Sequence, residues 1–576
     1  MKIHLSILIL VLFANLVTAQ VSKTVNVPIA GTLSTILTAT EKTTVTNLTL
    51  TGNIDARDMK CIRNEIKSLA DLDLSGITIK AYSGNEGTSS FSNTVISYPE
   101  NELPQSSFNR FIDYIIIGES TLKTIVLPNT LTSIGNAAFS ICPTLTNITI
   151  PLGVTKIGKE AFQGCRGLTQ VIIPNSVTII DDLAFNTCEG LTNITLSDNL
   201  TKIGMYSFSK CSKLKELTIP NSVTSIGREA FSSCTGLTGL NISNSLTELE
   251  NMVFSGCNNL TNVIIPNSVT KIGGGTFGYC DKLKSIQLSN SLISIENYAF
   301  RNCIGLTEIT IPNSTTNIEL GAFAFCSGLS HITIPNSVSY INEQTFYNCS
   351  SLTSITLPGS IVAIDGMAFE SCTSLSSITI PDKVTSIGSQ AFRNCTSLIN
   401  VIIPNSVVYI NQFAFYNCQA LKSLTIPKSV TSISDQAFNE CNSLTSIYSF
   451  GVVPLIFNPI NSYGIFKSVN KTSCTLYVPT GSKALYQAAN QWQDFTNIVE
   501  MTTGFQPIEQ SDIKVIYRNR TLTILNADIG NKVGIYSLTG VKIKEQTIEN
   551  TQTNIVLSSG VYILRVGDYS GRVVIK

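Results

Sequence analysis

The sequence repeats itself with a fixed period of 23 from position 128 to position 449. A proline or a serine marks the start of each of fourteen repeats, with no insertion or deletion between them. A phenylalanine stands at position +11 from every marker, a cysteine at +14 and a leucine at +17. Self-similarity at such a fixed period indicates a solenoid, in which each coil buries its apolar side only against its neighbours. The markers are Pro128, Pro151, Pro174, Ser197, Pro220, Ser243, Pro266, Ser289, Pro312, Pro335, Pro358, Pro381, Pro404 and Pro427.

One repeat predicts three short elements in each coil. The segment Leu214–Ile219 alternates in its last residues, with Leu217 and Ile219 on one face and Glu216 and Thr218 on the other, which is the pattern of a half-buried strand. Pro220 ends this strand because proline has no N–H to donate to a sheet. Apolar residues three and six positions after the marker turn inward again, and Ala230, Phe231 and Cys234 have the spacing of one helical turn. We therefore expect a mainly β solenoid with one short helical turn per repeat.

Stacking these coils predicts a core ladder of phenylalanine, cysteine and leucine. Equivalent residues of successive repeats should lie about 4.8 Å apart, the spacing of neighbouring strands. Each ring would then pack on the ring above it and on the ring below it. Representative members of this ladder are Phe139, Phe231, Phe323, Phe415, Cys142, Cys234, Cys326 and Cys418.

The ladder contains fourteen of the sixteen cysteines. Disulfides are one interpretation, since exported proteins use them and adjacent coils are close enough. However, equivalent side chains in a stack point the same way, whereas a disulfide needs a dihedral angle near 90°. A metal site is a weaker alternative because the sequence has no Cys-x-x-Cys pair. We expect buried free thiols that act as small apolar groups, and core positions for Cys61 and Cys474.

Composition argues against several classes of function. Charged residues make up only 13% of the chain and the formal net charge is zero, so nucleic acid is not an expected partner. His4 and His331 are the only histidines, which argues against His-dependent catalysis and multi-His metal sites. Asp181 and Asp182 are adjacent in the sequence and so are poorly placed for shared acid–base chemistry. We expect no enzyme, no cofactor and no metal.

The core motif Ala-Phe-x-x-Cys-x-x-Leu resembles the 23-residue leucine-rich repeat of BspA-like, or Treponema-type, bacterial surface proteins. The resemblance covers residues 128 to about 449 and implies a leucine-rich-repeat solenoid. Departures are mild, with polar or smaller residues at a few core positions: Ser207, Val253, Thr276, Thr315 and Thr345. The resemblance also implies adhesion, binding of host proteins and aggregation with other cells.

The first nineteen residues read as a secretory signal peptide. A short polar start is followed by the apolar run Leu5–Leu12 and by small residues at Val17–Ala19. This run is too short to span a bilayer of about 30 Å, and no later run approaches 18 apolar residues. We expect export, a mature chain that begins near Gln20 and no transmembrane segment.

The remaining chain divides around the repeats. Residues 20–127 should form an N-terminal cap, with a helix around Met59–Leu69 and a strand at Leu69–Ile77. Asp71 and Asp73 suggest a cation site there, but alternation on a strand favours solvent exposure for both. Residues 450–502 should form a closing cap with a strand at Cys474–Pro479, a helix at Ser482–Trp492, and Trp492 in its core. The last domain covers residues 503–576, and the polar stretch 501–511 links its strands to the closing cap.

Seven short alternating strands after the linker predict a small C-terminal β-sandwich. The phrases Tyr536–Gly540, Ser559–Ile563 and Arg572–Lys576 resemble the C-terminal sorting domain of type IX secretion. This resemblance implies the type IX secretion machinery as a partner, passage across the outer membrane and either removal of the domain or anchoring to lipopolysaccharide. A generic β-sandwich binding module is the alternative.

Exposed side chains indicate where a ligand would bind. Threonine recurs on the strand face, which fits β propensity and solubility better than ordered water. Aromatic residues outside the core ladder are more informative, because exposed aromatics favour interfaces. We predict a partner-binding patch of Tyr340, Tyr347, Tyr409, Phe413 and Tyr416 for an extracellular protein or glycan. The expected function is that of a secreted or cell-surface binding protein, an adhesin; the alternative is a structural, self-associating envelope component.

Overall fold

The structure is a computed structural model of the whole chain. It describes residues 20–89, 94–112, 115–457, 464–501, 514–518, 521–525, 532–537, 542–548, 552–557, 560–566 and 569–575. The expected signal peptide and almost all of the expected linker lie outside the described residues. No described helix is long and apolar enough to cross a membrane.

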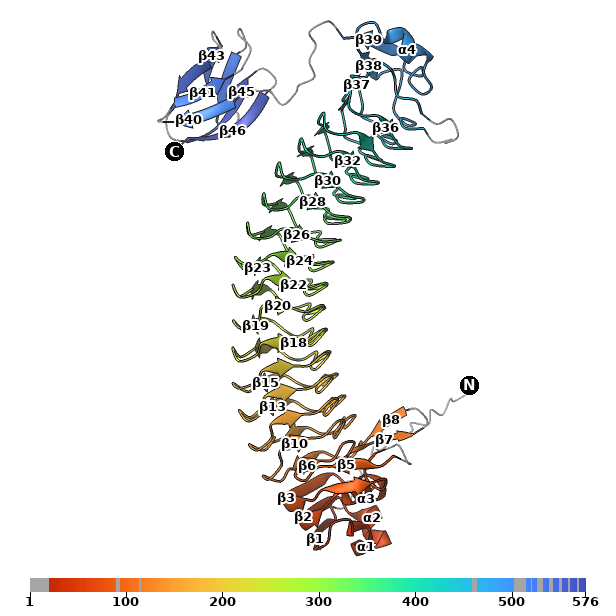
Figure 1. Cartoon of the computed structure of the whole chain (residues 1–576), viewed down its shortest axis with the longest axis vertical. Coiled ribbons are helices and arrows are strands. Elements are labelled where there is room, and N and C mark those ends of the chain that lie inside the picture. Colours follow the sequence, from red (N-terminus) through yellow and green to blue (C-terminus); the bar gives the residue numbers. More distant parts are fainter. Residues whose placement is uncertain are drawn as a thin grey trace, which may run out of the picture.

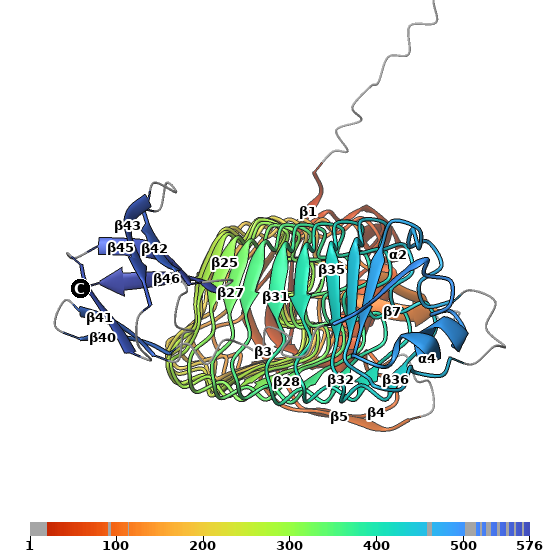
Figure 2. The same cartoon turned by 90° about the horizontal axis from the view of Figure 1, so that it is seen from above.

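The repeats form a solenoid of stacked coils that follows a gentle arc (Figure 1). Each coil contributes one strand to each of two parallel stacks, which lie on opposite sides of the solenoid when it is viewed along its length (Figure 2). Strands of neighbouring coils pair in register, so that each residue lies beside its equivalent in the next repeat, as in Leu217 with Leu240 and Ile203 with Ile226. The predicted solenoid of 23-residue repeats is therefore confirmed.

The first stack contains the strands predicted from the alternating pattern. In most of them the outward residues are exposed and the residue between them is buried, as in Glu308, Ile309 and Thr310. The strands are β9 (Thr124–Val126), β11 (Asn147–Ile148), β13 (Gln170–Ile172), β15 (Asn193–Thr195), β17 (Glu216–Thr218), β19 (Gly239–Asn241), β21 (Asn262–Ile264), β23 (Ser285–Gln287), β25 (Glu308–Thr310), β27 (His331–Thr333), β29 (Ser354–Thr356), β31 (Ser377–Thr379), β33 (Asn400–Ile402), β35 (Ser423–Ile426) and β37 (Ser446–Ser449).

The second stack is built from two-residue strands whose second residue is buried in the core. The sequence predicts this stack only as apolar residues that turn inward after each marker. The strands are β10 (Ser133–Ile134), β12 (Lys156–Ile157), β14 (Ile179–Ile180), β16 (Lys202–Ile203), β18 (Ser225–Ile226), β20 (Glu248–Leu249), β22 (Lys271–Ile272), β24 (Ser294–Ile295), β26 (Asn317–Ile318), β28 (Tyr340–Ile341), β30 (Ala363–Ile364), β32 (Ser386–Ile387), β34 (Tyr409–Ile410) and β36 (Ser432–Ile433).

The predicted helical turn in each repeat is wrong. In the fifth repeat the segment 227–234 is a series of tight turns, because Glu229 and Ser233 have positive φ values of 56° and 58°. Alternate N–H groups close these turns within the coil, as from Ala230 to the Gly227 carbonyl. The other N–H groups reach along the solenoid, as from Phe231 to the carbonyl of Val253 in the next coil. A helix would have kept all of these bonds inside one coil.

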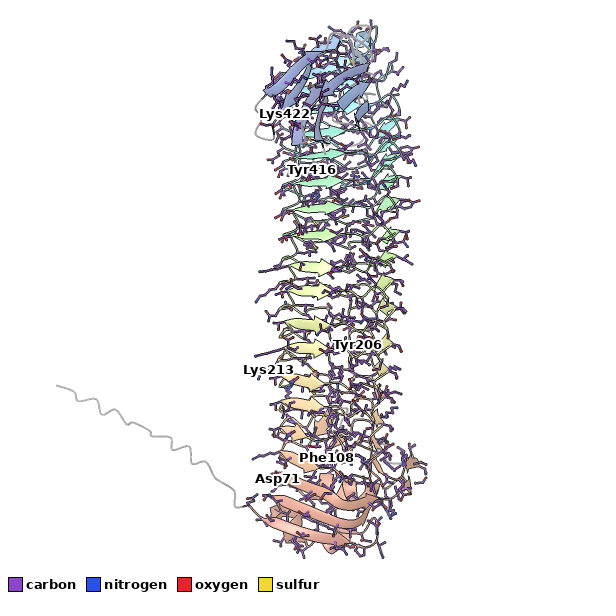
Figure 3. The ribbon with its side chains drawn as sticks, turned by 90° about the vertical axis from the view of Figure 1, so that its left-hand side faces the viewer. Asp71, Phe108, Tyr206, Lys213, Tyr416 and Lys422 are labelled. Carbon is purple, nitrogen blue, oxygen red and sulfur yellow. The ribbon has the colours of Figure 1, made fainter. Side chains whose placement is uncertain are left out.

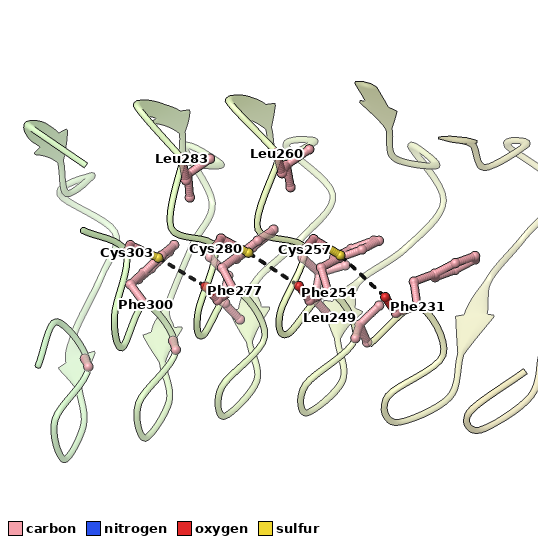
Figure 4. Packing of buried hydrophobic residues seen from close by; sticks show 14 of the residues in the cluster. Phe231, Leu249, Phe254, Cys257, Leu260, Phe277, Cys280, Leu283, Phe300 and Cys303 are labelled. Carbon is pink, nitrogen blue, oxygen red and sulfur yellow. Dashed lines mark hydrogen bonds between the residues drawn. The ribbon is translucent and has the colours of Figure 1, made fainter. Parts of the chain in front are cut away.

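The phenylalanine ladder runs through the centre of the solenoid. Successive rings stack with centroids 5.0–5.8 Å apart and planes inclined by 2–17°. The column extends past the repeats at both ends, from Phe108 to Phe466. Figure 4 shows cysteines beside these rings. The S–H of Cys257, Cys280 and Cys303 each donates a hydrogen bond to the phenylalanine carbonyl of the preceding coil.

The N-terminal segment continues both stacks. Its strand β3 pairs with β9 of the first stack, and β6 pairs with β10 of the second. The helix expected from Met59 onward runs over Ala56–Glu65, so Leu69 lies beyond its end, although Leu69 is buried. The elements are β1 (Ser22–Val27), α1 (Leu33–Ile36), α2 (Ala39–Thr44), β2 (Asn47–Ile54), α3 (Ala56–Glu65), β3 (Asp71–Ile79), β4 (Tyr82–Gly84), β5 (Ile96–Tyr98), β6 (Glu102–Leu103), β7 (Asn109–Ile112) and β8 (Ile115–Gly118).

The segment after the repeats adds two further strands to the first stack, β38 (Thr475–Val478) and β39 (Asn497–Glu500). The helix α4 (Lys483–Ala488) is shorter than expected and ends before Trp492. The Trp492 side chain is fully buried, and its Nε1 donates a hydrogen bond to the Leu455 carbonyl at 3.1 Å.

The C-terminal segment contains the seven strands expected there. They form two antiparallel sheets, β40–β41–β44 and β43–β42–β45–β46. Both sheets contribute to a small core of their own, which includes Ile524 and Leu564. The strands are β40 (Lys514–Arg518), β41 (Thr521–Leu525), β42 (Lys532–Tyr536), β43 (Lys542–Thr547), β44 (Gln552–Val556), β45 (Gly560–Val566) and β46 (Tyr569–Ile575).

Candidate functional site

The outward face of the first stack is regular and carries few charges. Glu308, His331 and Ser354 lie side by side in register on β25, β27 and β29. The Ser354 hydroxyl is 3.5 Å from Nδ1 of His331, and no ion pair joins Glu308 to His331 in the described part of the chain. All three side chains are exposed, so nothing excludes water or orients the imidazole as a general base.

A shallow hollow lies where this face meets the marker segments of three consecutive coils. It is lined by hydroxyl, amide and proline groups and by no charged side chain: Asn290, Thr310, Ile311, Pro312, Asn313, Ser314, Thr333 and Pro335. Such a surface offers hydrogen bonds, and none of these side chains is an acid or a base that would activate the hydroxyl of Thr310, Ser314 or Thr333.

Burial governs the chemistry of the cysteine column. All sixteen cysteines are buried and free, including Cys61 and Cys474 outside the column. Burial raises the pKa of Cys165, Cys234 and Cys280 to about 12. These three thiols therefore remain protonated near neutral pH, whereas a metal ligand or a nucleophile has to be a thiolate. No group of side chains suited to hold a metal ion occurs among the described residues, Asp71 and Asp73 included.

The tight turns present a second surface, which we call the turn edge. It consists of the residues 9, 12 and 13 positions after each marker, at the outer ends of the tight turns. In repeats one to six only Tyr206 is aromatic at these positions. In repeats seven to thirteen six residues are aromatic: Tyr279, Tyr298, Phe325, Tyr347, Phe413 and Tyr416. Figure 3 marks Tyr206 and Tyr416 at separate levels along the solenoid.

The structure divides the five predicted patch residues between two places. Tyr340 and Tyr409 lie on β28 and β34 of the second stack, and each is 53% exposed. Tyr347, Phe413 and Tyr416 lie on the turn edge and are half-buried. The rings of Phe413 and Tyr416 meet edge to face at 5.6 Å. Among the described residues, no ring contact links Tyr340 or Tyr409 to the other three.

Sequence reasoning missed a cluster centred on Arg301, which we call the Arg301 cluster. The guanidinium carbon lies 5.8 Å from the ring centroid of Tyr279, 5.4 Å from that of Tyr298 and 5.3 Å from that of Phe325. Phe325 in turn meets Tyr347 edge to face at 5.1 Å. A column-by-column comparison of the turn-edge positions shows that aromatic residues gather there in consecutive repeats, but it does not show that three of their rings converge on Arg301.

A second arginine, Arg393, occupies the same repeat position four coils later. Its guanidinium carbon lies 5.6 Å from the Tyr416 ring. Unlike Arg301, it forms an ion pair, with 3.1 Å between its nitrogen and the carboxylate of Glu370 in the preceding coil. Gln390 also accepts a hydrogen bond from it at 3.0 Å. Burial raises the pKa of Glu370, and the positive charge of Arg393 opposes that shift.

Comparison with known families identifies the repeats. A model described as the BspA type leucine rich repeat region matches residues 60–168, 132–261, 247–376 and 362–473. These matches together span well over half of the chain. This chain belongs to the BspA-type leucine-rich repeat family. The family match begins before the first regular repeat and ends after the last, and no enzyme family is indicated.

Solved structures of leucine-rich repeat proteins are also similar to this chain. A leucine-rich repeat protein from Bacteroides ovatus is 28% identical, covers 69% of this chain and 98% of its own, and has a TM-score of 0.54. A leucine rich cell surface protein from Faecalibacterium prausnitzii is 25% identical, covers 67% of this chain and 89% of its own, and has a TM-score of 0.37. A leucine-rich repeat protein from Treponema pallidum is 30% identical, covers 28% of this chain and 77% of its own, and has a TM-score of 0.26. No curated protein matches the chain.

Proposed function

We propose that this BspA-type protein is an exported, non-catalytic binding protein displayed at the cell surface, and that it acts as an adhesin for a host or matrix protein. One observation carries the proposal. Aromatic and arginine side chains gather on the turn edge of repeats seven to thirteen, while the earlier repeats carry mainly small and polar residues there.

The chemistry of this surface supports a binding role. Tyrosine and arginine are enriched at protein interfaces and supply much of their binding energy. A solenoid holds them on a rigid backbone, so little conformational entropy is lost when a partner docks. The family assignment and the cell-surface protein from Faecalibacterium prausnitzii are consistent with display outside the cell.

A binding panel of matrix proteins, serum proteins and glycans, probed with the full chain, tests this function directly. We expect saturable binding to at least one protein, weakened by the double substitution Tyr347→Ser and Tyr416→Ser. The matched double substitution Tyr340→Ser and Tyr409→Ser removes equally aromatic groups from the second stack and serves as the comparison. Binding to no member of the panel, together with self-assembly of the purified chain, would favour the structural envelope component instead.

The Tyr347→Ser and Tyr416→Ser variant should remain folded. Both rings are half-buried. Tyr347 contacts the Phe325 ring, and Tyr416 contacts the Phe413 ring and the Arg393 guanidinium. Such contacts contribute about 0.5–1.5 kcal/mol each. We therefore expect a small fall in thermal midpoint and a native circular dichroism spectrum, so that lost affinity can be separated from lost structure.

Export is a second part of the proposal. We propose that residues 1–19 are a signal peptide and that residues 503–576 form a β-sandwich sorting domain for type IX secretion. Two antiparallel sheets with a core of their own support the sandwich, and the phrases at 536–540, 559–563 and 572–576 support the sorting role.

Deletion of residues 503–576 tests the sorting role in a bacterium that has the pathway. The intact chain should become accessible to protease added outside the cell, whereas the truncated chain should remain inside the envelope. A chain that lacks residues 1–19 should stay in the cytoplasm and serves as the control. Surface exposure of the truncated chain would contradict the sorting role.

A further inference from the structure

The Arg301 cluster contains a positive charge that the protein itself does not neutralise. No carboxylate of the described residues lies within 4.0 Å of the Arg301 guanidinium, and no hydrogen bond of its terminal nitrogens is found there. Its Nε is buried without a hydrogen-bond partner, as is the Nε of Arg393, so the two arginines differ in their terminal nitrogens. The terminal nitrogens of Arg301 are not among the buried atoms, so they face solvent and can donate to a ligand.

Comparison with the Arg393 site shows that Arg301 lacks a neutralising carboxylate. Arg301 and Arg393 occupy the same position of their repeats, and each backbone carbonyl accepts a 2.7 Å hydrogen bond from the preceding coil, from Tyr279 and Ser371 respectively. Glu370, at the equivalent position one repeat before Arg393, neutralises that arginine. The equivalent residue one repeat before Arg301 is Gly278, which has no side chain. The coil beneath Arg301 therefore lacks the carboxylate that the coil beneath Arg393 supplies.

The surroundings of Arg301 also leave room for a ligand group. Gly278 lies in the preceding coil and Ala324 in the following one at the same repeat position. The neighbouring Gly321 has a φ of 58°, and a Cβ at this position would collide with the Tyr298 ring. The ring is thus held over the Gly321 backbone, beside the guanidinium. Tyr279, on the other side, is 46% exposed and can contact a ligand.

We propose that the Arg301 cluster binds an acidic segment of a protein partner, with an aspartate or glutamate carboxylate placed on the Arg301 guanidinium. This inference rests on the proposed binding function and names the chemistry of its ligand. Arginine pairs with carboxylates through two parallel hydrogen bonds, and the flanking rings reduce competition from water. The combination of arginine with Tyr279, Tyr298 and Phe325 is the composition of a protein interface centre.

The experiment measures binding of the full chain to a labelled synthetic peptide of alternating glutamate, tyrosine and glycine by fluorescence anisotropy. We expect saturable binding that weakens with salt, and no binding of the matched glutamine peptide. Arg301→Gln should weaken binding about tenfold or more, and Arg301→Lys by less, because lysine keeps the charge but loses the planar fork. Arg228→Gln should leave binding of the peptide unchanged, because Arg228 lies in the fifth repeat, away from the turn edge of the later repeats, and is paired with Glu229 at 3.0 Å.

The decisive variant is Gly278→Glu. It recreates the Glu370–Arg393 arrangement one coil below Arg301, so the internal carboxylate should displace the peptide and weaken binding about tenfold or more. The circular dichroism spectrum and the thermal midpoint should stay close to those of the original chain, since this repeat position already accepts Glu370.

Three results would overturn the proposal. The glutamate peptide could fail to bind, or Arg301→Gln and Gly278→Glu could bind it as well as the original chain does. A hyaluronan oligosaccharide could bind through Arg301 where the peptide does not, in which case the ligand is an acidic glycan rather than a protein segment. Panel binding that survives Arg301→Gln would leave the proposed function standing, whereas absence of all panel binding would remove the function itself.

Discussion

Each cysteine of the column donates its S–H to a phenylalanine carbonyl of the preceding coil. The sulfur of Cys234 is 3.2 Å from the Phe208 carbonyl oxygen, and that of Cys257 is 3.4 Å from the Phe231 oxygen. The same Phe231 carbonyl also accepts the N–H of Cys234 within its own coil. The thiol therefore fills a small apolar space and satisfies the second lone pair of a buried carbonyl, which alanine would leave unpaired.

The buried thiols predict a specific loss of stability in alkaline solution. Burial raises the pKa of Cys234 to about 12, whereas an unfolded thiol ionises near pH 8.5–9. Above about pH 9 the unfolded chain releases protons that the folded chain keeps, so the free energy of unfolding falls as pH rises. Between about pH 9 and pH 12, each such thiol lowers the free energy of unfolding by about 1.4 kcal/mol per pH unit, and below pH 9 it has no effect on the slope. Urea unfolding followed by circular dichroism at several pH values measures this slope.

Removal of one thiol provides the control for the alkaline slope. The free energy of unfolding of the Cys234→Ala variant should fall less steeply with pH than that of the original chain, by the contribution of one thiol. The Lys and Tyr residues contribute equally to the slope of both proteins. A thiol reagent should also fail to label the folded chain near pH 8 and label all sixteen cysteines after unfolding. Rapid labelling of the folded chain would contradict the burial of the column.

The element that distinguishes this solenoid is its tight-turn segment. Residues 9 and 13 positions after the marker adopt positive φ in every one of the fourteen repeats, and most of them are not glycine. This conformation costs an L-residue roughly 1–2 kcal/mol, but it lets alternate N–H groups bond to the next coil. The hydrogen bonds along the solenoid offset the strain within each coil.

Ser233 offers a direct test of this strain. Its φ is 58°, and the equivalent residue of the next repeat is Gly256. Ser233→Gly should leave stability unchanged or raise it by up to about 1 kcal/mol, because relief of strain competes with the greater entropy of the unfolded chain. Ser233→Val should lower stability by at least about 1–2 kcal/mol, since a β-branched residue fits this conformation poorly. Urea midpoints compare the three proteins, and a valine variant as stable as the glycine variant would contradict the assigned conformation.

The sequence predicts the strands of the first stack and the core ladder, but it does not predict the turns. Ala230, Phe231 and Cys234 have a spacing that fits a helix as well as consecutive turns. The left-handed positions hold residues as different as Glu229, Ser233 and Gly256, so no glycine signal marks them. The conformation is decided by hydrogen bonds to the next coil, which exist only after the coils have stacked.

At the scale of the whole molecule, stability is shared between neighbouring coils. The Phe300 ring contacts Phe277 at 5.7 Å and Phe323 at 5.4 Å between centroids, and all three are fully buried. Contacts of this kind link each coil only to the coil before and the coil after it, as in other repeat proteins.

Truncation of one ring should therefore weaken the solenoid locally. Phe300→Ala should cost about 3–5 kcal/mol through lost burial and a residual cavity. Hydrogen exchange followed by mass spectrometry should show faster exchange in the mutated repeat and in its two neighbours, with distant repeats unchanged. Thr333→Ser, on the exposed face of β27, is the control. Uniformly faster exchange along the solenoid would contradict nearest-neighbour stability.

The candidate binding surface is only partly readable from the sequence. The aromatic residues Tyr347 and Tyr416 stand out because most repeats carry polar residues at their position. The role of Arg301 emerges only from the structure, because its three rings come from three different coils and two different repeat positions. Their convergence depends on the tight turns, which the spacing of apolar residues does not specify.

Hydrogen exchange of the full chain, alone and saturated with the tightest binder from the panel, tests the central claim most directly. That claim is that the turn edge of the later repeats forms the recognition surface. Slower exchange should appear in segments 275–302, 321–348 and 390–417 and should be absent from the earlier repeats. Protection confined to the exposed strand face around His331–Thr333, or to residues 514–575, would contradict it.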